Sequence, residues 1–118
     1  MKTAFGILAL FSFSAVAGEA DIIDAKIISR GENRYDFQVT VEHADDGWEH
    51  YADRWEILTP SGEMLATRVL HHPHVQEQPF TRGLSGIEIP PSITSVTLRG
   101  YDKLHGYGGK TLTLQLPD

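Results

Sequence analysis

The sequence contains no cysteine, which removes two kinds of chemistry. The chain cannot form disulfide bonds, so its stability must come from an apolar core. It also has no thiolate that could bind a metal ion. A lipid anchor attached to cysteine is excluded for the same reason. Positive charge is also scarce, since the sequence has 10 Lys and Arg residues and 16 Asp and Glu residues. The basic residues are scattered singly along the chain and form no basic run. The resulting net charge of −6 repels phosphate backbones and excludes nucleic acid as a partner.

Long apolar runs and helical periodicity are missing as well. After residue 20, no segment keeps a helical pattern for three turns, which argues against an α/β fold. None approaches the roughly 20 apolar residues that cross a bilayer, so we expect no integral membrane segment in the mature chain. A chain of 118 residues without an internal linker is expected to form one domain.

The amino-terminal segment has the order of a secretory signal peptide. Lys2 precedes a short apolar run from Ala4 to Phe13, and small residues follow at Ala15 and Ala17. We predict that residues 1–17 are a signal peptide, with a second candidate cleavage site after Ala20, and that residues 18–118 are the mature domain. The alternative is a retained anchor helix, for which the apolar run is too short. The expected location is periplasmic or secreted.

Short apolar segments follow, separated by turn residues at intervals of about 8 to 12, a spacing typical of sandwiches and barrels. The clearest is residues 35–43, where Tyr35, Phe37, Val39, Val41 and His43 share one face of a strand. The last two strands, which contain Val96 and Leu98 and then Leu112 and Leu114, are expected to pair. We predict seven strands, over residues 22–29, 35–43, 48–58, 64–70, 78–89, 95–101 and 110–116.

Trp55 is the expected centre of the core. It stands between the charged residues Arg54 and Glu56, which would face water while the indole points inward. A tryptophan in the third strand fills the gap between the sheets of many sandwiches. The predicted fold is therefore all-β, a single sandwich that resembles the immunoglobulin or fibronectin type III architecture.

Several segments together resemble a group of small exported bacterial proteins of uncharacterised function. The resemblance covers most of the mature chain, and its distinctive segments are residues 46–48, 51–56, 72–74, 77–82 and 106–110. The resemblance implies export and a compact β domain. It implies no activity and no catalytic residues.

The clustering of histidines is the most unusual chemical feature of the sequence. Five of the six histidines lie between residues 43 and 74, and three of them form the segment His71-His72-Pro73-His74. Ligands two residues apart on an extended chain project to one side, so His72 and His74 could share a copper or zinc ion. Candidates to complete the shell are His43, His50, His71, Glu77, Asp45 and Asp46. The alternative is that these histidines only make a connecting loop polar.

Other functional patterns are weaker. Asp53, Arg54 and Glu56 could form crosswise ion pairs with Glu77 and Arg82 that fix strand register. Ser85 lacks the Gly-x-Ser-x-Gly context of a hydrolase, and the glycines at 106–109 precede a strand rather than a helix. We therefore expect a non-enzymatic binding or accessory module without a cofactor. Its loops, which carry the aromatic residues Trp48, Tyr51, Tyr101 and Tyr107, could contact a protein partner.

Overall fold

The computed structural model describes residues 19–45 and 47–118, which form seven strands. The predicted signal peptide over residues 1–17 lies outside these residues. Within the described part of the chain, no helix has the length and apolar character needed to cross a membrane. The strands are β1 (Asp21–Gly31), β2 (Arg34–Glu42), β3 (Ala52–Leu58), β4 (Met64–Val69), β5 (Phe80–Glu88), β6 (Ser95–Asp102) and β7 (Leu112–Gln115).

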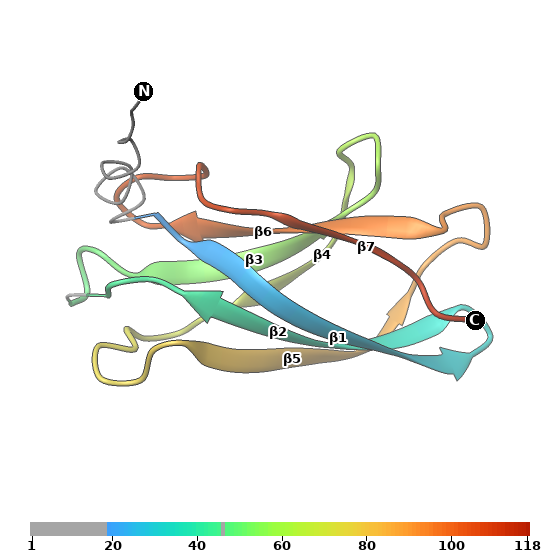
Figure 1. Cartoon of the computed structure of the whole chain (residues 1–118), viewed down its shortest axis with the longest axis horizontal. Coiled ribbons are helices and arrows are strands. Elements are labelled where there is room, and N and C mark those ends of the chain that lie inside the picture. The colour runs from blue at the N-terminus through green and yellow to red at the C-terminus, as the bar shows by residue number, and fades with distance from the viewer. Residues whose placement is uncertain (1–18, 46) are drawn as a thin grey trace, which may run out of the picture.

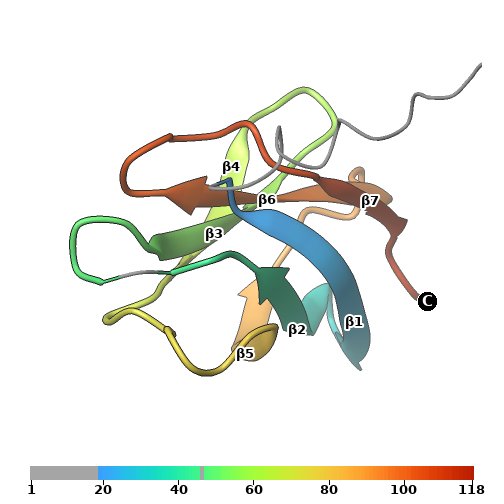
Figure 2. The ribbon, with the colours of Figure 1, turned by 60° about the vertical axis from the view of Figure 1, so that its left-hand side comes forward.

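The strands form two antiparallel sheets that pack face to face (Figures 1 and 2). One sheet has the order β1-β2-β5 and the other the order β4-β3-β6-β7. The predicted pairing of the last two strands is confirmed, with Val96 opposite Leu114 and Leu98 opposite Leu112. The prediction of an all-β sandwich with seven strands is therefore correct.

The core lies between the two sheets, and Trp55 is at its centre with none of its surface exposed. Phe37 and Val39 from β2 and Val96 and Leu98 from β6 are also fully buried, as their alternation predicts. β7 contributes less, because its Leu112 and Leu114 are only half-buried. Burying side chains of this size supplies about 1.5–3 kcal/mol each, which fits a fold without disulfides.

Three strands begin later than the sequence pattern predicts, and one of them is β7, which begins at Leu112 instead of residue 110. β3 begins at Ala52 instead of residue 48, because Gly47 and His50 form a separate bridge of their own. β5 begins at Phe80 instead of residue 78, directly after Pro79, which lacks the N–H that a strand ladder needs. All three differences lengthen the loops that precede these strands.

Three loops meet at one end of the sandwich, which we call the loop end: residues 43–51, 70–79 and 103–111 (Figures 1 and 2). The Gln78 side chain joins two of them, because its Oε1 accepts the His43 N–H at 2.9 Å and its Nε2 donates to the His74 carbonyl at 2.9 Å. The third is joined by the Lys103 N–H, which donates to the Tyr51 carbonyl at 2.9 Å. These bonds hold the three loops against one another.

Candidate metal site

Strand alternation carries two polar side chains into the interior at the loop end. His43 lies two residues beyond Val41 and continues the inward face of β2, while Asp102 lies two residues beyond Gly100 and ends the inward face of β6. Because the two strands belong to opposite sheets and both run toward the loop end, these side chains meet across the sandwich. His43 is 2% exposed and Asp102 is 0% exposed.

Three imidazole nitrogens converge on one oxygen of Asp102. His43 Nε2 contacts Asp102 Oδ2, His50 Nε2 lies 2.9 Å from it, and His105 Nδ1 lies 3.3 Å from it. We call these four residues the His-Asp cluster. Among residues 19–45 and 47–118, His43, His50 and Asp102 are the one group of three metal-ligating side chains, with their ligand atoms within 4.8 Å of one another.

The second oxygen of Asp102 fixes the turn that carries His105. Asp102 Oδ1 accepts the backbone N–H of Leu104 at 2.6 Å and of His105 at 3.0 Å. Asp102 and Gly106 also exchange two backbone hydrogen bonds, and Gly106 has a φ of 75°, which glycine adopts without strain. One carboxylate therefore both organises the turn and presents its free oxygen to the three imidazoles.

A second buried carboxylate supports His43 from behind. His43 Nδ1 is hydrogen-bonded to Asp45 Oδ1, and Asp45 also accepts the backbone N–H of Ala52 at 3.0 Å and of His74 at 2.6 Å. A carboxylate on the far nitrogen of a histidine is the usual support of a histidine that binds metal, because it fixes the orientation and tautomer of the ring. Asp45 stands in that position for His43.

The two carboxylates hold His43 in its protonated form in the metal-free protein. Burial by itself lowers the pKa of His43, but hydrogen bonds to Asp45 and Asp102 outweigh it and raise the pKa to about 9. Burial would raise the pKa of Asp102, but the N–H groups of His105 and Leu104 and the His43 side chain lower it to about 2. Around His43, the described residues then contribute one imidazolium and two buried carboxylates.

The side chains of this arrangement are of the kinds that coordinate divalent metal ions. One carboxylate oxygen faces three imidazoles, and each of these rings can present a neutral nitrogen as a ligand. Zinc accepts a tetrahedral set of nitrogen and oxygen ligands, with bonds of about 2.0–2.2 Å and ligand atoms about 3.3–3.5 Å apart. The distances of 2.9 and 3.3 Å from Asp102 Oδ2 to His50 and His105 are close to that spacing. Among the described residues, the ligand atoms of His43, His50 and Asp102 lie within 4.8 Å of one another, and His105 lies next to this group without belonging to it.

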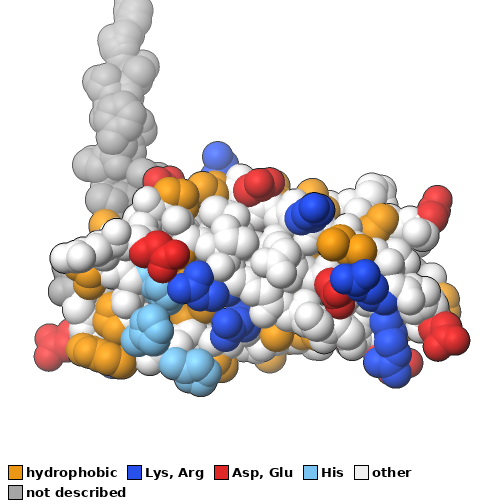
Figure 3. All heavy atoms as spheres, turned by 90° about the horizontal axis from the view of Figure 1, so that it is seen from below, with side chains coloured by type: hydrophobic (Ala, Val, Ile, Leu, Met, Phe, Trp, Pro, Cys, Tyr) orange, Lys and Arg blue, Asp and Glu red, His pale blue; other side chains and the backbone are white. Residues whose placement is uncertain are grey.

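The structure brings together only part of the set that the histidine pattern predicts. His43 and His50 belong to the His-Asp cluster, but His71, His72, His74 and Glu77 do not. Glu77 is exposed and pairs with Arg82 at 3.3 Å. Asp46 lies outside the described residues. Figure 3 shows exposed histidine side chains toward one end of the face in view.

The expected pair His72 and His74 lies side by side, but in an unsuitable setting. Their ring centroids are 4.8 Å apart, yet His72 is exposed whereas His74 is buried and stacked on Phe80 at 3.9 Å. Neither ring nitrogen of His74 has a hydrogen-bond partner in the described part of the chain. Burial lowers the pKa of His74, which favours the neutral ring, and the ring packs on Phe80.

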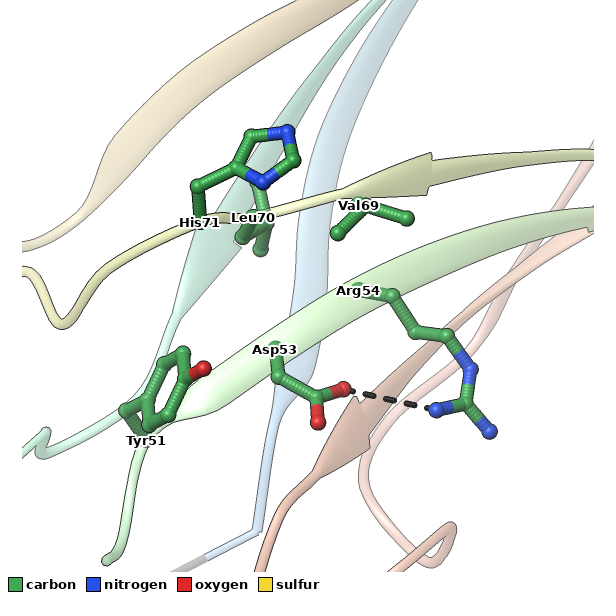
Figure 4. A pocket seen from close by; sticks show the side chains of 6 residues that line it. All are labelled: Tyr51, Asp53, Arg54, Val69, Leu70 and His71. Carbon is green, nitrogen blue, oxygen red and sulfur yellow. Dashed lines mark hydrogen bonds and ion pairs between the residues drawn. The ribbon is translucent and has the colours of Figure 1, made fainter. Parts of the chain in front are cut away.

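His71 lies at a different place, on the wall of a cavity of about 240 Å³ (Figure 4). Val69, Leu70 and His71 stand on one side, and Asp53 and Arg54 of β3 stand on the other. Burial raises the pKa of Asp53, which pairs with Arg54 at 3.4 Å. His71 and Asp53 line this cavity, but among the described residues they do not belong to a group of three metal-ligating side chains like that in the His-Asp cluster.

Sequence reasoning missed Asp102 and His105. The signal for Asp102 was present, because the alternation of Val96, Leu98 and Gly100 continues by one step to residue 102. A buried aspartate at that position needs partners, since an unpaired buried charge is costly. His105 had no comparable signal, because its place depends on the turn that Asp102 closes.

The expected charge network on β3 exists, but it does not join the two sheets. Glu56 is 2% exposed and accepts from Arg54 at 2.9 Å, Arg99 at 2.8 Å and the Tyr107 hydroxyl at 2.9 Å. Arg99 also stacks over the Tyr107 ring at 3.8 Å. The network therefore fastens the 103–111 loop to its own sheet, and Glu77 and Arg82 form a separate pair.

Comparison with known proteins gives one relative. The chain is 42% identical over 96 residues to a protein of Halomicrobium mukohataei that is named "Putative lipoprotein". The matched region makes up 81% of this chain and 47% of that protein, so the chain spans about half the length of the relative. No family model and no solved structure matches the chain.

Proposed function

We propose that this protein is an exported, non-enzymatic module that binds a divalent transition metal ion through the His-Asp cluster. The observation that supports it is the convergence of three imidazole nitrogens on one buried oxygen of Asp102. A carboxylate that needed only hydrogen bonds would be satisfied by fewer donors, since its other oxygen already accepts two N–H groups.

Charge balance favours an ion of charge +2. When His43 gives up its Nε2 proton to coordinate, Asp45 and Asp102 are the two buried charges that remain around it in the described part of the chain, and a divalent ion neutralises both. The chain has no cysteine, and the ligands are imidazole and carboxylate. That set suits Zn²⁺ and Cu²⁺ and offers no soft sulfur ligand for Cu⁺.

Two observations support export. The first 17 residues have the pattern of a signal peptide, and the relative carries the word lipoprotein in its name. Expression of the full chain with a carboxyl-terminal tag, followed by cell fractionation and mass spectrometry, tests this part. We expect a mature protein that begins near residue 18 or 21 outside the cytoplasm, and an uncleaved cytoplasmic chain would contradict it.

Metal binding is tested by titrating the metal-free protein with Zn²⁺ and following both heat and melting temperature. An ion present at 100 times its Kd stabilises the folded state by about 2.7 kcal/mol. For a domain of this size, that raises the melting temperature by roughly 10 °C or more. One ion per chain is expected.

Matched single-histidine variants separate the His-Asp cluster from the neighbouring histidines. His50→Ala should remove most of the thermal shift, because it deletes a ligand, whereas His72→Ala should keep it. If the wild type shows no shift, metal binding at this site is ruled out. If only His72→Ala loses the shift, the ion is held by the His72 and His74 pair instead.

A further inference from the structure

The four residues of the His-Asp cluster differ sharply in their access to solvent. The side chains of His43 and Asp102 are 0% exposed, that of His50 is 16% exposed, and that of His105 is 42% exposed. Among the described residues, the side of His105 is therefore the most open approach to the cluster for an external molecule. Approach from the side of His43 and Asp102 would require the two sheets of the sandwich to separate.

His105 is also the member whose ring can leave while the rest stays in place. Its Nδ1 lies 3.3 Å from Asp102 Oδ2, farther than His50 Nε2 at 2.9 Å. Its backbone is fixed independently of the ring, because its N–H donates to Asp102 Oδ1 at 3.0 Å. Rotation about the His105 side-chain bonds thus moves the imidazole into water and leaves the turn intact, whereas His43 is held by Asp45 on its other nitrogen.

We infer that His105 is the exchangeable ligand of the cluster, and that a neutral nitrogen donor from outside takes its place on the bound ion. This inference rests on the proposed metal binding. In the exchange, the bond from the ion to His105 Nδ1 breaks and a bond to the incoming nitrogen forms. Both ligands are neutral, so the charge of the site stays constant and no electron is transferred. The ion would enter and leave by this route.

The test uses Co²⁺, whose visible absorption reports its coordination, with free imidazole as the external donor. His105→Gly deletes an exposed ring and opens a place for imidazole. We expect the variant to bind Co²⁺ more weakly than the wild type, by at least the roughly 10–100-fold that loss of a supporting partner costs. Added imidazole should restore both the affinity and the wild-type spectrum. Release of Co²⁺ to a chelator should be faster in the variant without imidazole.

The matched control is His50→Gly, which deletes a less exposed ligand and should recover far less with imidazole. The inference is overturned if His105→Gly binds Co²⁺ as tightly as the wild type, or if its affinity stays low in imidazole. The inference is also overturned if imidazole restores the Co²⁺ affinity of both variants equally, because an external donor would then reach the position of His50 as easily as that of His105. Failure of the wild type to bind Co²⁺ would remove the proposed function itself, which is a different result.

Discussion

The metal-free protein should lose stability when the pH rises through the value at which His43 loses its proton. Both ring nitrogens of His43 face buried carboxylates, on Asp45 and on Asp102. Only the imidazolium carries a hydrogen on each nitrogen, so only the protonated ring satisfies both. Deprotonation leaves one nitrogen lone pair against a carboxylate in the interior, which destabilises the fold.

The size of the effect follows from the two pKa values. The pKa of His43 is about 9 in the folded protein, because bonds to Asp45 and Asp102 outweigh the effect of burial, and it is 6.5 in the unfolded chain. The folded state thus binds the proton more tightly, and its extra stability is complete below pH 6.5 and lost as the pH rises through about 9. At about 1.36 kcal/mol per pKa unit, the free energy of unfolding should fall by roughly 3 kcal/mol.

Urea unfolding at pH 6, 7.5, 9 and 10, with a chelator present to keep the protein metal-free, measures this change. His43→Gln is the control, since glutamine makes hydrogen bonds but does not titrate. The wild type should lose roughly 3 kcal/mol over this range and the variant much less, so that their difference isolates His43. Equal slopes for the two proteins, or a wild type whose stability is constant from pH 6 to pH 10, would refute the assignment of a buried imidazolium.

Three further changes test other parts of the structure. Asp45→Asn should weaken Zn²⁺ binding by about 10–100-fold, because it removes the carboxylate behind His43; titration calorimetry would show this, and unchanged affinity would contradict it. Trp55→Ala should lower the free energy of unfolding by about 3–5 kcal/mol, since it empties the centre of the core, and a loss below 1 kcal/mol in urea would argue against the packing described. Glu56→Gln should cost about 1–3 kcal/mol, because two arginines lose their charged partner; a neutral effect in the same assay would mean that the network contributes no stability.

Much of the fold follows from local patterns along the chain. The two-residue period of β2 placed Phe37 and Val39 inside, and the position of Trp55 between charged residues marked the centre of the core. Strand starts were less predictable, because the bridge between Gly47 and His50 is a feature of the folded loop. For the candidate site, the pattern identified His43 and His50 but favoured His72 and His74 because of their spacing.

The sequence by itself determined which residues alternate inward, because side-chain direction along a strand is a local property with a period of two. It therefore determined the all-β class and the burial of His43. Only the tertiary structure decided that Asp102 lies opposite His43 and that His105 turns back to the same oxygen. These contacts depend on how two sheets face each other and on which strands end at the same side. Neither relation is encoded within any one segment of the chain.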